Sequence, residues 1–144
     1  MITQRFHYIF DAWGINPKIL NGKKLVVSLL KDTAKLCKMR IISGPHIVQG
    51  MDYNPGISGF TIIDFSHISI HTFSAPGEVC VDIFSCKPFD PNEVKGYLLK
   101  KLKVNEKNLY FFQVNYPATK KITSARMSFA SMKTRKLQMA NSTR

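Results

Sequence analysis

Two short segments of alternating polar and apolar residues, 66–71 and 78–86, most constrain what this chain can fold into. In the first, read as SHISIH, every second residue is apolar, which is the period of a β-strand with one buried face. The second, EVCVDIFSC, has the same period. Between them lies Ser74-Ala75-Pro76-Gly77, and proline followed by glycine favours a tight turn. The pattern predicts an antiparallel β-hairpin.

The turn also predicts which residues lie opposite each other. If it is centred on its two middle residues, His71 lies near Cys80. Ser66 then lies near Ser85 and Cys86. A hydroxyl, an imidazole and a thiol would converge along one hairpin, which suggests a reactive site. The plainer interpretation, a half-buried polar face with satisfied hydrogen bonds, stays open at this point.

The rest of the chain predicts further strands and two helices. Apolar residues recur at three- and four-residue spacing over 23–38, which predicts an amphipathic helix with Cys37 in the core. Asp90-Pro91-Asn92-Glu93 has the N-cap residue, the proline and the glutamate of a helix start. We expect strands at 5–13, at 39–48 with a break at Gly44-Pro45, at 57–65 and at 109–114, with a loop at 49–56.

This order of elements predicts an α+β fold. We expect a two-layer sandwich, with a mostly antiparallel sheet and two main helices packed on one face. The 144 residues are enough for one domain with a real core, which we place at 1–118. No apolar run approaches the roughly 18 residues that cross a bilayer. Charged residues near the N-terminus also argue against a signal peptide, so we expect no membrane association.

The cysteines and histidines do not form a recognisable metal motif. Three cysteines without metal-binding spacing predict reduced thiols in the cytoplasm and no metal. His67 and His71 would lie roughly 13 Å apart on a strand, too far to share one ion. His67-Ile68-Ser69 also matches half of the paired signature of two-histidine phosphoesterases. Neither His7 nor His46 has Ser or Thr two residues later, so the second half is missing.

Much of the net charge of +12 lies at the C-terminal end. From 116 to 144 there is no acidic residue, and the segment has seven cations: Lys120, Lys121, Arg126, Lys133, Arg135, Lys136 and Arg144. Weak periodicity and many polar residues predict a basic, flexible tail at 119–144. A solvated tail is the plainer interpretation, and an accessory site for nucleic acid or another polyanion is the alternative.

Three motifs together resemble a known family. Gly56-Ile57-Ser58-Gly59, then SHISIHT, then VDIFSC are similar to the pyruvoyl-dependent S-adenosylmethionine decarboxylases of prokaryotes. The similarity extends more weakly from about His7 to Val114 and so covers most of the domain. The second and third motifs, at this separation, are specific. The basic tail lies outside the resemblance.

The resemblance implies a proenzyme that cuts itself between Phe65 and Ser66. The Ser66 hydroxyl would attack the preceding carbonyl, and elimination would leave a pyruvoyl group at the new N-terminus. By position, Ser58 and His71 match the processing residues, with His71 as the proton carrier. Cys86 matches the proton donor of the decarboxylation. The pyruvoyl group made from Ser66 would form a Schiff base with the substrate amine, so no external cofactor and no metal is implied.

The resemblance also implies a homodimer of cleaved protomers, in which both protomers contribute to each site. Several residues depart from the family pattern. Phe65 replaces a glutamate before the cleaved serine. Phe73, Ser74 and Ala75 align with Trp-Pro-Glu, where the aromatic stacks on adenine and the glutamate binds the ribose. Phe73 can still stack, and Tyr53 lies near the second stacking aromatic of the family. Ala75 cannot hydrogen-bond a ribose through its side chain.

Three functions stay open on this basis. The first is decarboxylation of S-adenosylmethionine, which supplies aminopropyl groups for spermidine and other polyamines. The second is decarboxylation of arginine or ornithine, substrates that need no adenine or ribose contacts. The third is a binding or regulatory protein that is never processed, and that either pairs with an active relative or uses the basic tail to contact nucleic acid.

Overall fold

Six strands form a single antiparallel sheet in the order β2-β3-β4-β5-β1-β6. The computed structural model describes residues 4–116. The strands are β1 Phe6–Trp13, β2 Ile41–Met51, β3 Asn54–Ile63, β4 Ser66–Phe73, β5 Glu78–Ser85 and β6 Leu109–Val114. The helices are α1 Pro17–Leu20, α2 Lys23–Leu36, α3 Pro91–Leu102 and the short 3₁₀-helix η1 Glu106–Asn108.

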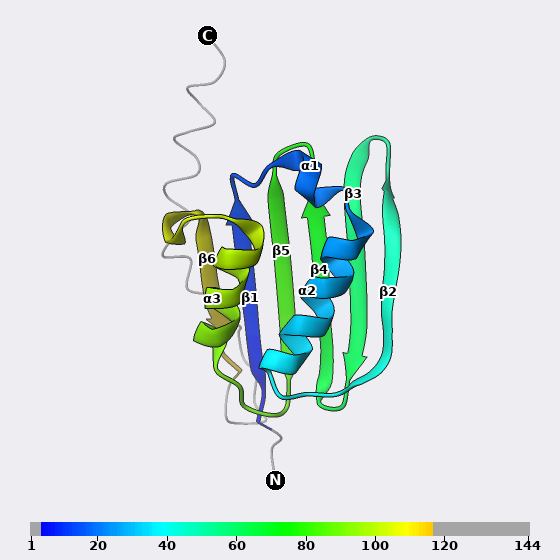
Figure 1. Cartoon of the computed structure of the whole chain (residues 1–144). Helices are drawn as coiled ribbons and strands as arrows, with labels where there is room; N and C mark the ends of the chain where they lie inside the picture. Colours follow the sequence, from blue (N-terminus) through cyan, green and yellow to red (C-terminus); the bar gives the residue numbers. More distant parts are fainter. Residues whose placement is uncertain (1–3, 117–144) are drawn as a thin grey trace. The chain divides into compact units, whose positions relative to one another are not determined.

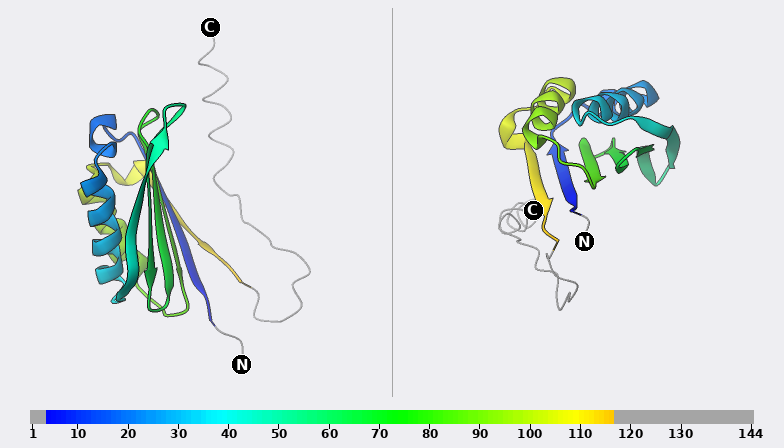
Figure 2. Two further views of the ribbon diagram at one scale, coloured as in Figure 1. Left: turned by 90° about the vertical axis from the view of Figure 1, so that its right-hand side faces the viewer. Right: turned by 90° about the horizontal axis from the view of Figure 1, so that it is seen from below.

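Helices α2 and α3 cover one face of the sheet, and the described residues leave the other face bare (Figures 1 and 2). This is the predicted α+β fold with two main helices on one side. The period of two in the hairpin explains the division. Ile68, Ile70 and Thr72 of β4 are buried, whereas His67, Ser69 and His71 between them face the uncovered side. The candidate His71 therefore lies on the open face.

Close packing of α2 on the sheet depends on Gly59 of β3. A Cβ atom at this position would lie 2.5 Å from Cγ1 of Val26 and 2.9 Å from Cδ1 of Leu30. Both are α2 residues that are fully buried. Glycine at the end of the Gly56-Ile57-Ser58-Gly59 motif thus allows the helix to approach the strand. The motif has a packing role in addition to the serine that it carries.

The predicted hairpin register is confirmed. Ser66 pairs with Ser85 and His71 pairs with Cys80, and residues 74–77 form the turn. The predicted start of α3 is also confirmed, because the Asp90 side chain accepts a hydrogen bond from the backbone N–H of Asn92 at 2.9 Å. Local turn and capping chemistry were enough to predict both features.

Three expectations about the elements were wrong in detail. The loop at 49–56 is mostly strand, because β2 and β3 pair as far as Met51 and Asn54 and leave only a two-residue turn. Strand β2 continues through Gly44-Pro45 with shifts of register instead of breaking there. Strand β3 ends at Ile63 rather than at 65. The predicted end of the first strand at Trp13 is confirmed, and Asn16 and Pro17 start the short helix α1, with the Asn16 side chain accepting from the backbone N–H of Lys18.

The division of the chain at 118/119 stays a prediction. The first compact unit runs from Met1 to Val114, and the second, Asn115–Arg144, lies almost entirely outside the described residues. The predicted basic tail therefore also lies outside them. Within residues 4–116, no helix is long and apolar enough to cross a membrane.

Candidate active site

The bond predicted to be cut lies in the turn between β3 and β4. Two hydrogen bonds between Arg40 and Asp64 hold this turn. The backbone N–H of Asp64 donates to the Arg40 carbonyl oxygen at 2.9 Å, and the backbone N–H of Arg40 donates to Oδ1 of Asp64 at 3.0 Å. Ser66 follows with φ of +140°, a region that residues other than glycine rarely occupy. Such a conformation costs roughly 1–3 kcal/mol. The residue predicted to cleave the chain is therefore strained.

The carbonyl group of Phe65, which precedes Ser66, faces two donors from Cys86. The backbone N–H of Cys86 donates to the Phe65 oxygen at 3.0 Å, and the thiol sulfur lies 3.5 Å from the same oxygen. Donors at this position stabilise negative charge that develops on a carbonyl oxygen under nucleophilic attack. The pairing of β4 with β5 brings the Phe65–Ser66 bond and Cys86 together, as the predicted register required.

The Phe65 side chain contacts a cation. The Lys87 ammonium lies 5.0 Å from the centroid of the Phe65 ring and also donates to the carbonyl oxygen of Lys38 at 2.9 Å. The ring face attracts the positive charge. The backbone of Lys87 is fixed by Ser85, whose hydroxyl accepts from its N–H at 2.9 Å and donates to its carbonyl at 2.8 Å.

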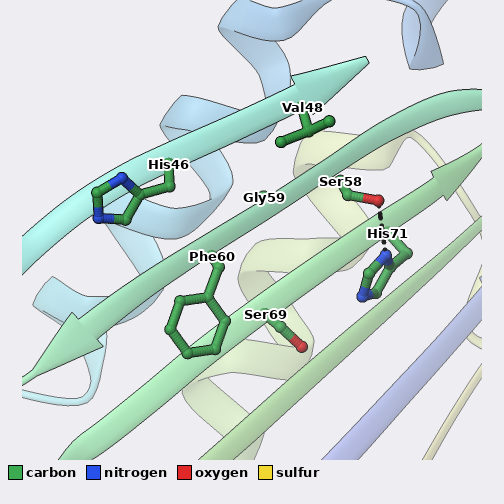
Figure 3. A pocket seen from close by; sticks show the side chains of 7 residues that line it. All are labelled: His46, Val48, Ser58, Gly59, Phe60, Ser69 and His71. Atoms are coloured by element: carbon green, nitrogen blue, oxygen red, sulfur yellow. Dashed lines mark hydrogen bonds between the residues drawn. The ribbon is translucent and has the colours of Figure 1, made fainter. Parts of the chain in front are cut away.

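The predicted processing residues Ser58 and His71 are joined by a hydrogen bond of 2.9 Å between Oγ and Nδ1 (Figure 3). They face each other across the β3–β4 ladder on the open face. A pocket of about 140 Å³ lies beside them, lined by His46, Val48, Ser58, Gly59, Phe60, Ser69 and His71. Sites for small molecules usually enclose about 300–1,000 Å³. Within residues 4–116, this pocket is smaller than that range.

A single chain does not bring all the predicted residues together. His71 is five residues from Ser66 along β4, which corresponds to roughly 16 Å. Phe73 lies at the far end of the same strand, and Tyr53 is 87% exposed in the turn between β2 and β3. Phe65, Ser66 and Cys86 form one group and the remaining predicted residues form another. Ser58 and His71 lie on the open face, whereas the Phe65 ring packs against the core.

The three thiols differ in their surroundings. Burial raises the pKa of Cys37 to about 12, with a smaller effect from Glu93, and this residue is part of the core as predicted. Burial, followed by the nearby carboxylates of Asp11 and Asp82, raises the pKa of Cys80 to about 11. Both thiols therefore stay protonated at neutral pH. Among the three, only Cys86 is exposed.

Sequence reasoning missed a polar group next to Ser66. Asp82 of β5 lies between two histidines, at 2.6 Å from Nε2 of His7 and at 3.8 Å from Nε2 of His67. The strand order that brings β1 beside β5 has no local signal, so His7 could not be assigned to this group. Within residues 4–116, no three His, Cys, Asp or Glu side chains are grouped as a metal site requires.

Comparisons with known proteins show which family the chain resembles. Residues 6–113 match the sequence profile of the family described as S-adenosylmethionine decarboxylase. The S-adenosylmethionine decarboxylase proenzyme of Thermococcus onnurineus is 33% identical over 105 residues, which are 72% of each chain. The proenzyme of the same name from Clostridium botulinum is 32% identical over 67% of this chain and 82% of its own. The crystal structure of the adenosylmethionine decarboxylase from Aquifex aeolicus superposes with a TM-score of 0.63 at 25% identity, covering 78% of this chain and 90% of that one.

Proposed function

This chain belongs to the S-adenosylmethionine decarboxylase family, and from this premise we propose that it is a self-processing, pyruvoyl-dependent decarboxylase of S-adenosylmethionine. The observation that carries the proposal is the environment of the Phe65–Ser66 bond. A strained serine follows a carbonyl oxygen that receives the backbone N–H of Cys86 at 3.0 Å. Both features favour attack of the serine hydroxyl on that carbonyl.

Self-cleavage would proceed through the Ser66 side chain. The Oγ atom forms a bond to the Phe65 carbonyl carbon while its proton leaves, and the oxygen of the tetrahedral intermediate is held by the Cys86 N–H. The bond between the Phe65 carbonyl carbon and the Ser66 nitrogen then breaks, and the nitrogen takes up a proton. The product is an ester between Phe65 and the Ser66 side chain. Loss of the Ser66 α-proton expels the Phe65 carboxylate, and hydrolysis with release of ammonia leaves the pyruvoyl group.

Cys86 is positioned to serve the decarboxylation that follows. The pyruvoyl group supplies an electrophilic carbonyl that accepts the electrons left behind when CO₂ departs. The Cys86 thiol lies 3.5 Å from the Phe65 oxygen, beside residue 66, and it is exposed to solvent. We assign it the delivery of a proton to the decarboxylated substrate. No metal is required at any of these steps.

The substrate would be held mainly by stacking. Phe73 and Tyr53 offer aromatic rings for the adenine, at the end of the sheet where Ser58 and His71 lie. Ala75 is exposed in the β4–β5 turn and has no side-chain donor or acceptor for the ribose hydroxyls. We therefore expect weaker binding of the ribose than of the base. The product would supply aminopropyl groups for spermidine and other polyamines.

Two copies of the chain would be needed to complete one site. Ser66 and His71 are roughly 16 Å apart in one chain, so a His71 that acts on Ser66 has to come from a second copy. The open face carries large apolar side chains with exposed fractions of 39–49%, namely Phe60, Ile62, Tyr110 and Phe112. A face of this kind is typical of an interface. We therefore propose a homodimer of cleaved protomers that pairs these faces.

The three cysteines of the chain are free, which supports a cytoplasmic location. The activity itself is tested by release of labelled CO₂ from S-adenosylmethionine, arginine and ornithine in parallel. We expect release from S-adenosylmethionine alone, and Cys86→Ala protein should release much less. Release from arginine or ornithine and not from S-adenosylmethionine would contradict the proposed substrate.

A further inference from the structure

We propose that His67 is the base that takes the proton from the Ser66 hydroxyl in the self-cleavage, with Asp82 and His7 as residues that position it. This inference rests on the proposed function and assigns a residue to the first chemical step of the same site. The hydroxyl oxygen of Ser66 lies 3.3 Å from Nδ1 of His67, so the imidazole reaches the reacting atom within one chain.

The imidazole of His67 is held in place on both sides by aromatic rings. It stacks on Phe60 with a centroid separation of 5.4 Å and on Phe84 with one of 5.6 Å, and both pairs are close to parallel. These rings come from β3 and β5, the two neighbours of β4. A side chain fixed in this way keeps Nδ1 directed at Ser66, which lowers the entropic cost of reaching the reactive arrangement.

The second ring nitrogen of His67 faces a carboxylate. Nε2 lies 3.8 Å from Oδ1 of Asp82, while Oδ2 of Asp82 lies 2.6 Å from Nε2 of His7. When Nδ1 accepts from the hydroxyl, the proton of the neutral ring is on Nε2, which points to Asp82. The imidazolium formed by proton transfer would then be stabilised by the Asp82 charge, and His7 keeps that carboxylate in position. Polar groups thus form a continuous row from Ser66 to His7.

His67 accounts for every proton transferred during formation of the ester. His67 Nδ1 takes the hydroxyl proton as the bond from Oγ to the Phe65 carbon forms. The same imidazolium returns the proton to the Ser66 nitrogen when the bond between carbon and nitrogen breaks, and the ester results. No oxidant or external acid is needed. His71 is roughly 16 Å from Ser66 in the same chain and is bonded to Ser58, so we assign it to the later elimination.

Two substitutions separate this role from a packing role. His67→Ala removes the base and opens a space between the two rings, whereas His67→Phe keeps an aromatic ring there but has no nitrogen. We expect both variants to be cut at least about a hundredfold more slowly than the wild type, the range in which general bases contribute. Added imidazole should restore cutting of His67→Ala and not of His67→Phe. Folding of both is monitored by the unfolding midpoint in urea.

Asp82 is tested as a positioning residue through its coupling to His67. We expect Asp82→Asn to slow cutting by a smaller factor than His67→Ala, and Asp82→Glu to recover part of the loss. The double variant of His67→Ala and Asp82→Asn should be no slower than His67→Ala alone, because Asp82 acts through the imidazole.

Hydroxylamine identifies the step that is blocked, because it splits esters and leaves amides intact. The uncut His67→Ala chain should resist hydroxylamine, whereas a His71→Ala chain arrested at the ester should be split by it. Three results would each overturn this inference and leave the proposed function standing. They are cutting of His67→Ala or His67→Phe at the wild-type rate, failure of imidazole to restore cutting of His67→Ala, and splitting of His67→Ala by hydroxylamine. A wild-type chain that is never cut would overturn the proposed function as well.

Discussion

The backbone N–H of Cys86 donates a hydrogen bond of 3.0 Å to the carbonyl oxygen of Phe65. This contact joins the residue before the predicted cleavage site to the residue that carries the predicted catalytic thiol. It also separates the two roles proposed for Cys86, because the backbone N–H would serve the cleavage and the thiol would serve the decarboxylation. Substitution of the side chain should therefore affect one process and spare the other.

Replacement of Cys86 by alanine tests this separation. We expect the Cys86→Ala chain to be cut, since its backbone N–H is retained, and to lose about a hundredfold or more in turnover, since the proton donor is gone. Cutting is measured on denaturing gels and turnover by CO₂ release. Cys80→Ala serves as the matched control, with both processes unchanged. If the Cys86→Ala chain stays uncut, the thiol is needed for the cleavage and its assignment to decarboxylation alone is wrong.

Complementation between two inactive chains tests whether one site is shared by two copies. Ser66→Ala and His71→Ala chains with different tags are each expected to remain a single chain when produced alone. When they are produced together, a mixed dimer has one site with an intact Ser66 and an intact His71. We expect the His71→Ala chain to be cut in these dimers, whereas the Ser66→Ala chain stays whole. If neither chain is cut in isolated mixed dimers, the site is not shared.

Substitution of Gly59 tests the packing of α2 on the sheet. A Cβ atom would lie 2.5 Å from Val26 and 2.9 Å from Leu30, so Gly59→Ala should lower the free energy of unfolding by about 1–3 kcal/mol. Urea unfolding is measured in the uncut Ser66→Ala background, so that cleavage does not complicate the transition. Gly96 of α3 has open space at the Cβ position, and Gly96→Ala should be neutral or stabilising by up to about 1 kcal/mol. Equal effects of both substitutions would contradict this account of Gly59.

The buried thiol of Cys37 makes stability depend on alkaline pH. Its pKa is raised from 9.0 to about 12 in the folded chain, mainly by burial. Its contribution is fully present below pH 9.0 and is lost between pH 9.0 and about 12, because only the unfolded chain releases the proton there. The free energy of unfolding should therefore fall by up to about 1.4 kcal/mol per pH unit through this group. In the uncut Ser66→Ala background, Cys37→Ala should show a flatter decline of the free energy of unfolding with pH. If this free energy falls equally steeply with and without Cys37, the thiol is not buried as described.

The parts of the site that follow from local chemistry could be predicted from the sequence. The Pro76-Gly77 turn determines the register of β4 against β5, and this register puts Ser66 beside Ser85 and His71 beside Cys80. The cap at Asp90 is local in the same sense. Each of these features depends on residues that are close together in the chain or joined by one short turn.

Other parts depend on contacts between distant segments. His7 and Asp82 are 75 residues apart and meet only because β1 lies between β5 and β6. No local pattern specifies that order of strands. The loop expected at 49–56 was wrong for a related reason, since its turn-forming residues Gly50, Asn54 and Pro55 lie where β2 and β3 pair. Propensity describes a residue alone, and pairing with a neighbouring strand overrides it.

Mass spectrometry of the purified wild-type protein under denaturing conditions tests the central claim most directly. We predict two fragments, residues 1–65 with a free carboxylate at Phe65 and a fragment that starts at position 66. The second fragment should be lighter by one molecule of ammonia than residues 66–144 with an unmodified serine. Ser66→Ala protein should give only the intact chain. An intact wild-type chain, or a fragment with an unmodified serine at its start, would contradict the account.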